Sequence, residues 1–324
     1  MKKMLVAIGI IFCMASPSMA GDVKISGAVE LQYLKSSDHY GSKGDDDFKA
    51  NELYVKVSKE VANNVEAMIK IDGADLESKT GSSSTHKAIE EAQIIFKNVA
   101  NQPLTLILGK DEMPFGQDYE KFLLDSRTHG FEIDKVLGAH GIYKAEGFGS
   151  IALGFFERAP KESGGSSTDR DTALTDSFAV KVKADKFVEN LSVEASYAKT
   201  GKDELVATEV DEDRMSVGAK LKVADATIHA EYTSFSDFEN VEKSDLDVIQ
   251  VGADYKIGNV LLKVRHEMSD DDVDNNNDEE NRTAAGISYY FSKKALVAVE
   301  WEKVSYDGAA DDEDELLLGA SFKF

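Results

Sequence analysis

Apolar and polar residues alternate at a period of two in sixteen separate stretches, which together cover most of the chain. In residues 65–72, for example, apolar residues occupy the odd positions, while Glu66, Lys70 and Asp72 lie between them. A strand points successive side chains to opposite faces, so this period indicates strands with one apolar and one polar face. The predicted strands are 22–35, 48–59, 65–75, 88–97, 104–110, 136–146, 149–158, 176–184, 191–200, 213–223, 226–236, 246–256, 260–268, 282–291, 295–305 and 315–324.

The connections between these strands alternate in length. The even-numbered ones are tight, whereas the odd-numbered ones are long, polar and mostly acidic: 36–47, 76–87, 111–135, 159–175, 201–212, 237–245, 269–281 and 306–314. A bacterial transmembrane barrel has an even strand number, short periplasmic turns and long external loops. The sequence therefore predicts an all-β fold, a transmembrane antiparallel β-barrel of about 16 strands. A soluble sandwich is the alternative, but strictly alternating loop lengths and the lack of a linker disfavour it.

The first 20 residues have the pattern of a secretory signal peptide. Lys2 and Lys3 precede an apolar core at residues 5–14, and small residues flank a cleavage site at residues 18–20. The apolar core is too short for a membrane-spanning helix, which needs about 20 residues. We expect a signal peptide at 1–20 and a single barrel domain at 21–324. The only cysteine, Cys13, lies in the signal, so no disulfide is expected in the barrel.

Acidic residues dominate the composition, with 60 Asp and Glu against 37 Lys and Arg and a net charge of −23. Nucleic-acid binding depends on basic surface, so a nucleic acid is excluded as a partner. No run of about 18 apolar residues follows the signal, which argues against a membrane-spanning helix. A polar composition is compatible with a barrel in the outer membrane, because only the outward half of each strand must be apolar.

Two segments resemble known outer-membrane families. The last four residues, Ser-Phe-Lys-Phe, resemble the closing strand of porins, which the barrel-assembly machinery recognises; this implies an assembly signal at Phe322 and Phe324. Residues 108–116, Leu-Gly-Lys-Asp-Glu-Met-Pro-Phe-Gly, are followed by Phe-Leu-Leu-Asp-Ser at 122–126. This pair of segments is similar to the phosphate-selective porins and, more closely, to the siderophore porins (LbtU-like).

The resemblance implies a porin, a water-filled channel for passive diffusion of small hydrophilic solutes and ions. A ligand-selective channel for a siderophore or for an anion such as phosphate is the alternative. The implied partners are outer-membrane lipid and lipopolysaccharide, the barrel-assembly machinery and the diffusing solutes, and a homotrimer is one assembly that porins form. The resemblance implies no cofactor.

The third long connection, residues 111–135, is the longest and is rich in large apolar residues for a loop. Long loops with apolar content of their own tend to pack and to carry function. A sixteen-stranded barrel encloses an aqueous lumen, so we expect this loop to fold into the lumen and narrow it. An external loop or a subunit latch is the alternative. The predicted constriction residues are Pro114, Phe115, Gly116, Asp118, Glu120, Asp125 and Arg127.

The alternation also predicts which charged side chains face the lumen. The inward bases are Lys181, Lys183, Arg214, Lys220, Lys222, Lys263, Arg265 and Arg282, and the inward acids are Glu52, Glu66, Glu194, Glu231, Glu267, Glu300 and Glu302. Rings of charge set the ion preference of a pore. One hypothesis is a transverse field between loop acids and wall cations; another is that these charges only keep the lumen hydrated. A lysine-rich wall would also suit anions.

Two further features were weighed as sites. Residues 270–280 are acid-rich, and Asp270, Asp272, Asp274 and Glu280 are candidate calcium ligands. The segment lacks the glycine of an EF-hand loop, and a solvated, self-repelling loop is the commoner outcome for such a block, so no metal site is predicted. The six histidines are scattered and form no catalytic motif, so an outer-membrane phospholipase or protease is disfavoured and no enzyme is predicted.

Overall fold

The computed structural model describes residues 22–37, 46–73, 89–117, 122–124, 126, 128, 131–133, 136–157, 177–202, 209–238, 241–271, 278–306 and 312–324. Sixteen strands account for nearly all of these residues, and a single 3₁₀ turn, η1 (Val99–Asn101), lies between two of them. The strands are β1 (Lys24–Ser36), β2 (Asp46–Ala62), β3 (Val65–Asp72), β4 (Ile89–Phe96), β5 (Leu104–Asp111), β6 (Val136–Ala145), β7 (Gly149–Phe156), β8 (Ser177–Val188), β9 (Leu191–Thr200), β10 (Glu212–Val223), β11 (Ala226–Ser236), β12 (Leu246–Ile257), β13 (Val260–Asp271), β14 (Asp278–Ser292), β15 (Ala295–Tyr306) and β16 (Glu313–Lys323).

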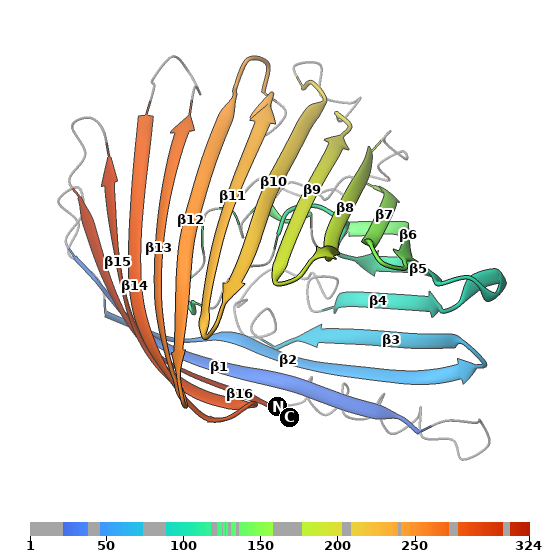
Figure 1. Ribbon diagram of the computed structural model, residues 1–324, viewed down its shortest axis with the longest axis horizontal. Coiled ribbons are helices and arrows are strands. Elements are labelled where there is room, and N and C mark those ends of the chain that lie inside the picture. Colours follow the sequence, from blue (N-terminus) through green and yellow to red (C-terminus); the bar gives the residue numbers. More distant parts are fainter. Residues whose placement is uncertain are drawn as a thin grey trace, which may run out of the picture.

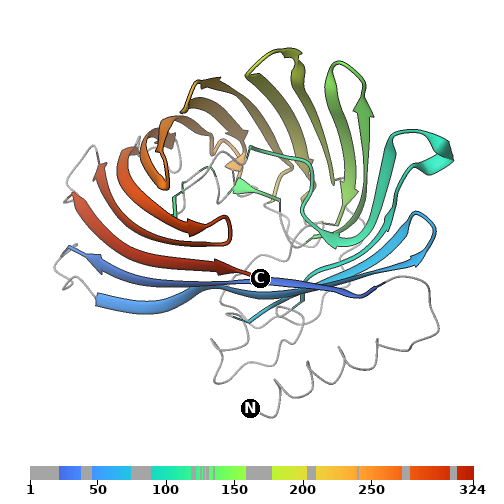
Figure 2. The same cartoon turned by 60° about the horizontal axis from the view of Figure 1, so that its bottom comes forward.

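Each strand pairs antiparallel with its neighbours in sequence, and β1 pairs with β16 to close the sheet (Figures 1 and 2). The closing ladder runs from Ser36 opposite Glu315 to Ala28 opposite Lys323. Two backbone hydrogen bonds continue it to the last residue: Phe324 N donates to Gly27 O at 3.0 Å, and Gly27 N donates to Phe324 O at 3.3 Å. The prediction of an all-β barrel of about 16 strands is confirmed.

The two faces of the wall differ in the sense expected of a barrel in lipid. On β12, Ile249, Val251 and Tyr255 point outward and are exposed, whereas Gln250 and Asp254 between them point inward and are buried. This is the reverse of a soluble protein, where apolar residues are inside, and it matches strands with an apolar outer and a polar inner face. Within the described residues, no helix is both long enough and apolar enough to cross a membrane.

Strand boundaries agree with the sequence prediction to within a few residues, with the larger differences in polar segments. The predicted connection 269–281 is too long, because β13 reaches Asp271 and β14 begins at Asp278. The ladder there pairs Ser269 with Glu280, and Glu280 also forms an ion pair with Arg282. Strand β8 likewise extends to Val188, past an irregularity in its pairing with β9. At residues 269–281 the acidic composition suggested a longer loop, but the strand ends there keep their backbone pairing.

The tight turns have the residues that their backbone requires. Asn64, Asn190 and Gly258 lie in the turns that follow β2, β8 and β12, with φ values of 61°, 65° and 57°. Two-residue hairpin turns need positive φ, which glycine and asparagine adopt most readily. These turns fix the register of the hairpins and therefore decide which side chains enter the lumen.

Candidate functional site

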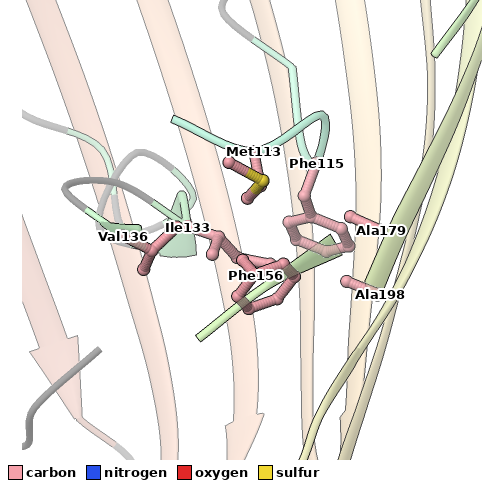
Figure 3. Packing of buried hydrophobic residues seen from close by; sticks show 7 residues of the cluster. All are labelled: Met113, Phe115, Ile133, Val136, Phe156, Ala179 and Ala198. Carbon is pink, nitrogen blue, oxygen red and sulfur yellow. The ribbon is translucent and has the colours of Figure 1, made fainter. Parts of the chain in front are cut away.

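The loop between β5 and β6 is packed against the inner wall at its root. Met113 and Phe115 are buried in a cluster with Ile133, Val136, Phe156, Ala179 and Ala198 (Figure 3). The ring of Phe115 lies against Ala179 of β8 and Ala198 of β9, whose small side chains leave room for it. Met113 N donates to Ile133 O at 2.8 Å, so the two ends of the loop are joined. The loop therefore starts inside the barrel.

Polar contacts hold the next two residues on β8 and β9. Gly116 N donates to Ser196 Oγ at 3.1 Å, and Lys181 Nζ donates to Gly116 O at 2.6 Å. The side-chain amide of Gln117 donates to the backbone oxygen of Glu194 at 3.3 Å. Every one of these wall groups is on an inward-facing position or its backbone.

The loop then reaches strands on the other side of the closed sheet. Glu300 of β15 accepts the backbone N–H of Leu123 at 2.8 Å and that of Leu124 at 2.9 Å. The two carbonyls are also bound: Gln32 Nε2 of β1 donates to Leu123 O at 2.9 Å, and an Arg265 guanidinium N–H donates to Leu124 O at 3.1 Å. Strands β1 and β9 are halfway round the barrel from one another, so described residues of the loop contact opposite sides of the inner wall.

The return path of the loop follows the wall from β12 to β10. Thr128 Oγ1 donates to Gln250 Oε1 at 2.6 Å, and Arg214 of β10 donates to Phe131 O at 3.0 Å. The Phe131 ring packs edge-on against Phe235, with 4.6 Å between the ring centroids. The described residues of the loop thus contact the inner wall from β7 round to β1.

Two cations of the inner wall, Lys263 and Arg265, are buried under the loop. Phe122 lies over Lys263 and Arg265, with its ring centroid 4.8 Å from Lys263 Nζ and 5.0 Å from Arg265 Cζ. Lys263 forms an ion pair with Glu300, both side chains being 0% exposed. Arg265 pairs with Glu302 at 2.7 Å and with Glu267 at 2.8 Å. An ion pair in this setting is shielded from solutes in the lumen.

The register explains why such long side chains fit beside each other. Across the sheet, Lys263 is opposite Gly286, which is opposite Glu300; Arg265, Ala284 and Glu302 form the next row. Each cation therefore reaches its glutamate over a small residue. A Cβ at Gly286 would lie 3.4 Å from the Phe122 ring, and one at Gly319 of β16 would collide with Leu123. The inner wall is shaped to receive the loop.

The inner face of β2–β4 differs from the wall under the loop, because its Lys56 is accessible and its Lys70 is partly so. Lys56 Nζ lies 3.4 Å from Glu91 Oε2, with the two side chains 39% and 21% exposed. Lys70 pairs with Glu90 at 2.9 Å and with Glu91 at 3.6 Å, and its ammonium lies 4.4 Å from the centre of the Tyr54 ring. Lys56 and Lys70 therefore each have a carboxylate beside them.

The predicted constriction residues are only partly described. Pro114, Phe115 and Gly116 lie at the loop root, and Phe115 and Gly116 contact the wall. Asp118, Glu120, Asp125 and Arg127 lie outside the described residues.

The predicted lumen bases point inward but are mostly engaged. Lys181 and Lys183 share Glu194 at 3.3 and 2.6 Å. Arg214 pairs with Glu212, Arg282 pairs with Glu280, and Lys220 and Lys222 lie near the periplasmic end of β10. Lys263 and Arg265 are buried, and the transverse field between loop acids and wall cations stays a prediction because the loop acids lie outside the described residues.

Sequence reasoning missed the residues that hold the loop. Gln32, Ser196 and Gln250 are at inward positions that the alternation identifies, but nothing local marks them as loop contacts. The small residues Ala284 and Gly286 were also missed, since their importance depends on the neighbouring strands. The exposed lysine Lys56 alternates in the same way as the buried Lys263, and only the loop path separates them.

The acid-rich external ends give no joint cation site. Asp270 points outward from β13, while Glu280 points inward from β14 and binds Arg282, so these two calcium candidates lie on opposite faces. Asp272 and Asp274 are outside the described residues. In the part of the chain that the structure describes, no group of three or more His, Cys, Asp or Glu is placed to hold a metal. At the rim, a hydrogen bond from Lys199 lowers the pKa of Asp211.

The similarity to known proteins covers almost the whole chain. Residues 5–309 match the family model described as Gram-negative porin. The fold is similar to OmpT of Vibrio cholerae in its trimer form (TM-score 0.67, 16% identity, covering 94% of this chain and 100% of that one). It is also similar to the outer membrane channel DcaP of Acinetobacter baumannii (0.70, 16%, 95% and 99%) and to an anion-selective porin from Comamonas acidovorans (0.67, 12%, 94% and 100%). No curated protein matched.

Proposed function

The chain belongs to the Gram-negative porin family, and on this premise we propose that solutes cross it beside β2–β4, in the part of the lumen that the loop leaves open. It is a channel of the outer membrane for passive diffusion.

The observation that supports this path is the contrast in exposure between two parts of the inner wall. Lys263 and Glu300 are 0% exposed beneath the loop, whereas the Lys56 side chain on β2 is 39% exposed. Water and small solutes can reach a charge only where no protein covers it, so the accessible ladder of β2–β4 lines the path.

The ion preference follows from which charges remain unbalanced along this path. Lys56 and Lys70 are each within 4 Å of a glutamate, so the ladder adds little net positive potential. We infer, as the sequence predicts, that Asp118, Glu120 and Asp125 of the loop, partly offset by Arg127, form the constriction of this path. Fixed negative charge at a narrow point raises the local cation concentration, so a weak cation preference is proposed.

An anion-selective or siderophore-selective channel is the less favoured function. It would require cations that a passing ligand can contact. Lys263 and Arg265 are buried and paired, and the partly exposed Lys181 and Lys183 are both engaged by Glu194, which offsets one of their two charges. We also propose that the chain is not an enzyme, that residues 1–20 are removed on export and that Phe322 and Phe324 serve barrel assembly.

The test is the reversal potential of single channels in a salt gradient. Replacing Lys56 and Lys70 by Gln should shift it toward cations, because Glu91 is then unbalanced. Replacing Asp118, Glu120 and Asp125 by Asn should shift it toward anions. Both shifts should shrink at 1 M salt, where the Debye length is about 3 Å.

The control is Lys263→Met, which removes one positive charge from beneath the loop, as Lys56→Gln alone removes one from β2. It should leave the reversal potential near the wild-type value. A control that shifts the potential as much as the β2–β3 variants, or loop variants without any shift, would contradict the proposed path.

A further inference from the structure

Glu231 of β11 is a buried carboxylate without a cation beside it. Its side chain is 4% exposed. One oxygen, Oε1, accepts hydrogen bonds from Ser216 at 2.7 Å and from Thr233 at 3.4 Å, while Oε2 is buried without any partner. None of the described ion pairs within 4 Å includes Glu231, and Lys181, the lysine whose charge acts on it, is bound by Glu194 together with Lys183. Burying an ionised carboxylate without a counter-charge is strongly unfavourable.

A second buried acceptor without a partner belongs to the loop root. Gln117 is 7% exposed, and its Nε2 donates to the Glu194 backbone, which leaves Oε1 without a donor. In the ladder, Gly218 lies directly between Glu194 and Glu231. The Gln117 amide lies over Gly218, since a Cβ there would be 2.6 Å from Gln117 Cδ. Opposite residues in a sheet have Cβ atoms only about 4.5–5.5 Å apart, so the amide is a neighbour of Glu231.

Two neighbouring acceptors that both lack a donor can be satisfied together by one proton. We propose that Glu231 is a neutral carboxylic acid whose O–H donates to Gln117 Oε1 and so fastens the loop root to β11. The groups that face Glu231 from the surrounding elements are Lys181 and Lys183 on β8, Glu194 on β9, Arg214 and Lys220 on β10, His229 on its own strand, Gln250 on β12 and Gln117 of the loop. The described ion pairs leave Glu231 without a cation partner.

The hydrogen bond from Glu231 to Gln117 makes the attachment of the loop root depend on pH. A protonated Glu231 holds Gln117 and is present at low pH. As pH rises and the proton leaves, a carboxylate oxygen and an amide oxygen face each other, and this contact becomes repulsive. The stabilisation is lost as pH rises through the titration of Glu231. The loop root should then loosen, which would widen the path.

The direct test is infrared spectroscopy of the folded full chain in deuterated buffer. A carboxylic acid has a C=O stretch that an ionised carboxylate lacks. The wild type at about pH 6 should show this band, it should be lost in Glu231→Gln, and it should disappear as pH rises toward about 9. Glu267→Gln is the matched control, because Glu267 is equally buried but pairs with Arg265. Its band should equal that of the wild type.

Two spectroscopic results would overturn the proposal. If Glu231→Gln removes no intensity at any pH, then Glu231 is ionised. If the band appears only after sodium is replaced by a bulky organic cation, a metal ion occupies the place of the proton.

The conductance measurement rests on the proposed channel function, so it is interpreted separately from the infrared measurement. Wild-type conductance should rise with pH, and this rise should be absent in Glu231→Gln, whose amide cannot lose the proton. The proposed hydrogen bond between Glu231 and Gln117 would be overturned if the infrared band behaves as expected but the conductance of Glu231→Gln still rises with pH as much as that of the wild type. Absence of conductance from every variant, with the band intact, would instead contradict the channel.

Discussion

Glu300 should control whether the middle of the loop stays docked on the far wall. Its carboxylate accepts the N–H groups of Leu123 and Leu124 and pairs with Lys263. A hydrogen bond to a charged group contributes about 1.5–3 kcal/mol. Two of them contribute about 3–6 kcal/mol to docking, which corresponds to a factor of about 10² to 10⁴ in the equilibrium between docked and undocked loop.

Removing Glu300 alone would also leave Lys263 buried without a partner, which costs about 3–5 kcal/mol. The informative comparison is therefore between the single variant Lys263→Met and the double variant with Lys263→Met and Glu300→Leu. Both lose the ion pair, but only the double variant loses the acceptor for the two loop amides. In the single variant the loop should stay docked.

Single-channel recording in planar bilayers checks the prediction. The double variant should show a larger mean conductance and more open-channel noise than Lys263→Met, because the loop no longer occupies the lumen beside β13–β15. Both proteins must migrate as folded, heat-modifiable barrels for the comparison to count. Equal conductance and noise in the two variants would refute the reasoning that these amide bonds hold the loop.

Three further outcomes are expected. Phe324→Asp or deletion of Phe324 should lower the amount of heat-modifiable barrel in the outer membrane by about tenfold, equivalent to about 1.4 kcal/mol, because either change removes the terminal aromatic residue proposed to serve barrel assembly; normal abundance would contradict it. Gly319→Val should displace Leu123 and increase the noise of the single-channel current. Adding Leu123→Ala to this variant should return the noise to the wild-type level; noise that stays high in the double variant would count against the contact between Gly319 and Leu123. Chemical cross-linking in native membranes tests the homotrimer that the sequence resemblance implies: a product of three chains would support it, and a product no larger than the monomer would oppose it.

The sequence predicted the barrel well because its information is local. Period-two alternation and tight turns with Asn64 or Asn190 specify each hairpin from adjacent residues, and sequential hairpins add up to a closed sheet. The same alternation gave the inward orientation of Lys263 and Glu231 without knowledge of any neighbour. Boundaries failed mainly where acidic residues such as Asp278 continue a strand.

The environment of each inward side chain was not predictable in this way. Lys56 and Lys263 have the same sequence pattern, yet one is accessible and the other is covered by Phe122. Whether a lysine meets a glutamate across Gly286 depends on the register of three strands, and the cover depends on a loop more than a hundred residues away in sequence. Such contacts are non-local, so no short window of the chain contains them.

The anchoring of Leu123 has a consequence for the order in which the molecule forms. Its carbonyl is held by Gln32 of β1, its side chain rests where Gly319 of β16 leaves room, and its amide is held by Glu300 of β15. The first and last strands meet only when the cylinder is completed. The part of the inner wall that binds Leu123 is therefore formed by strands from the two ends of the chain. It does not exist before the sheet closes. The loop must therefore dock late in folding, and a docked loop is found only in a barrel whose first and last strands have paired.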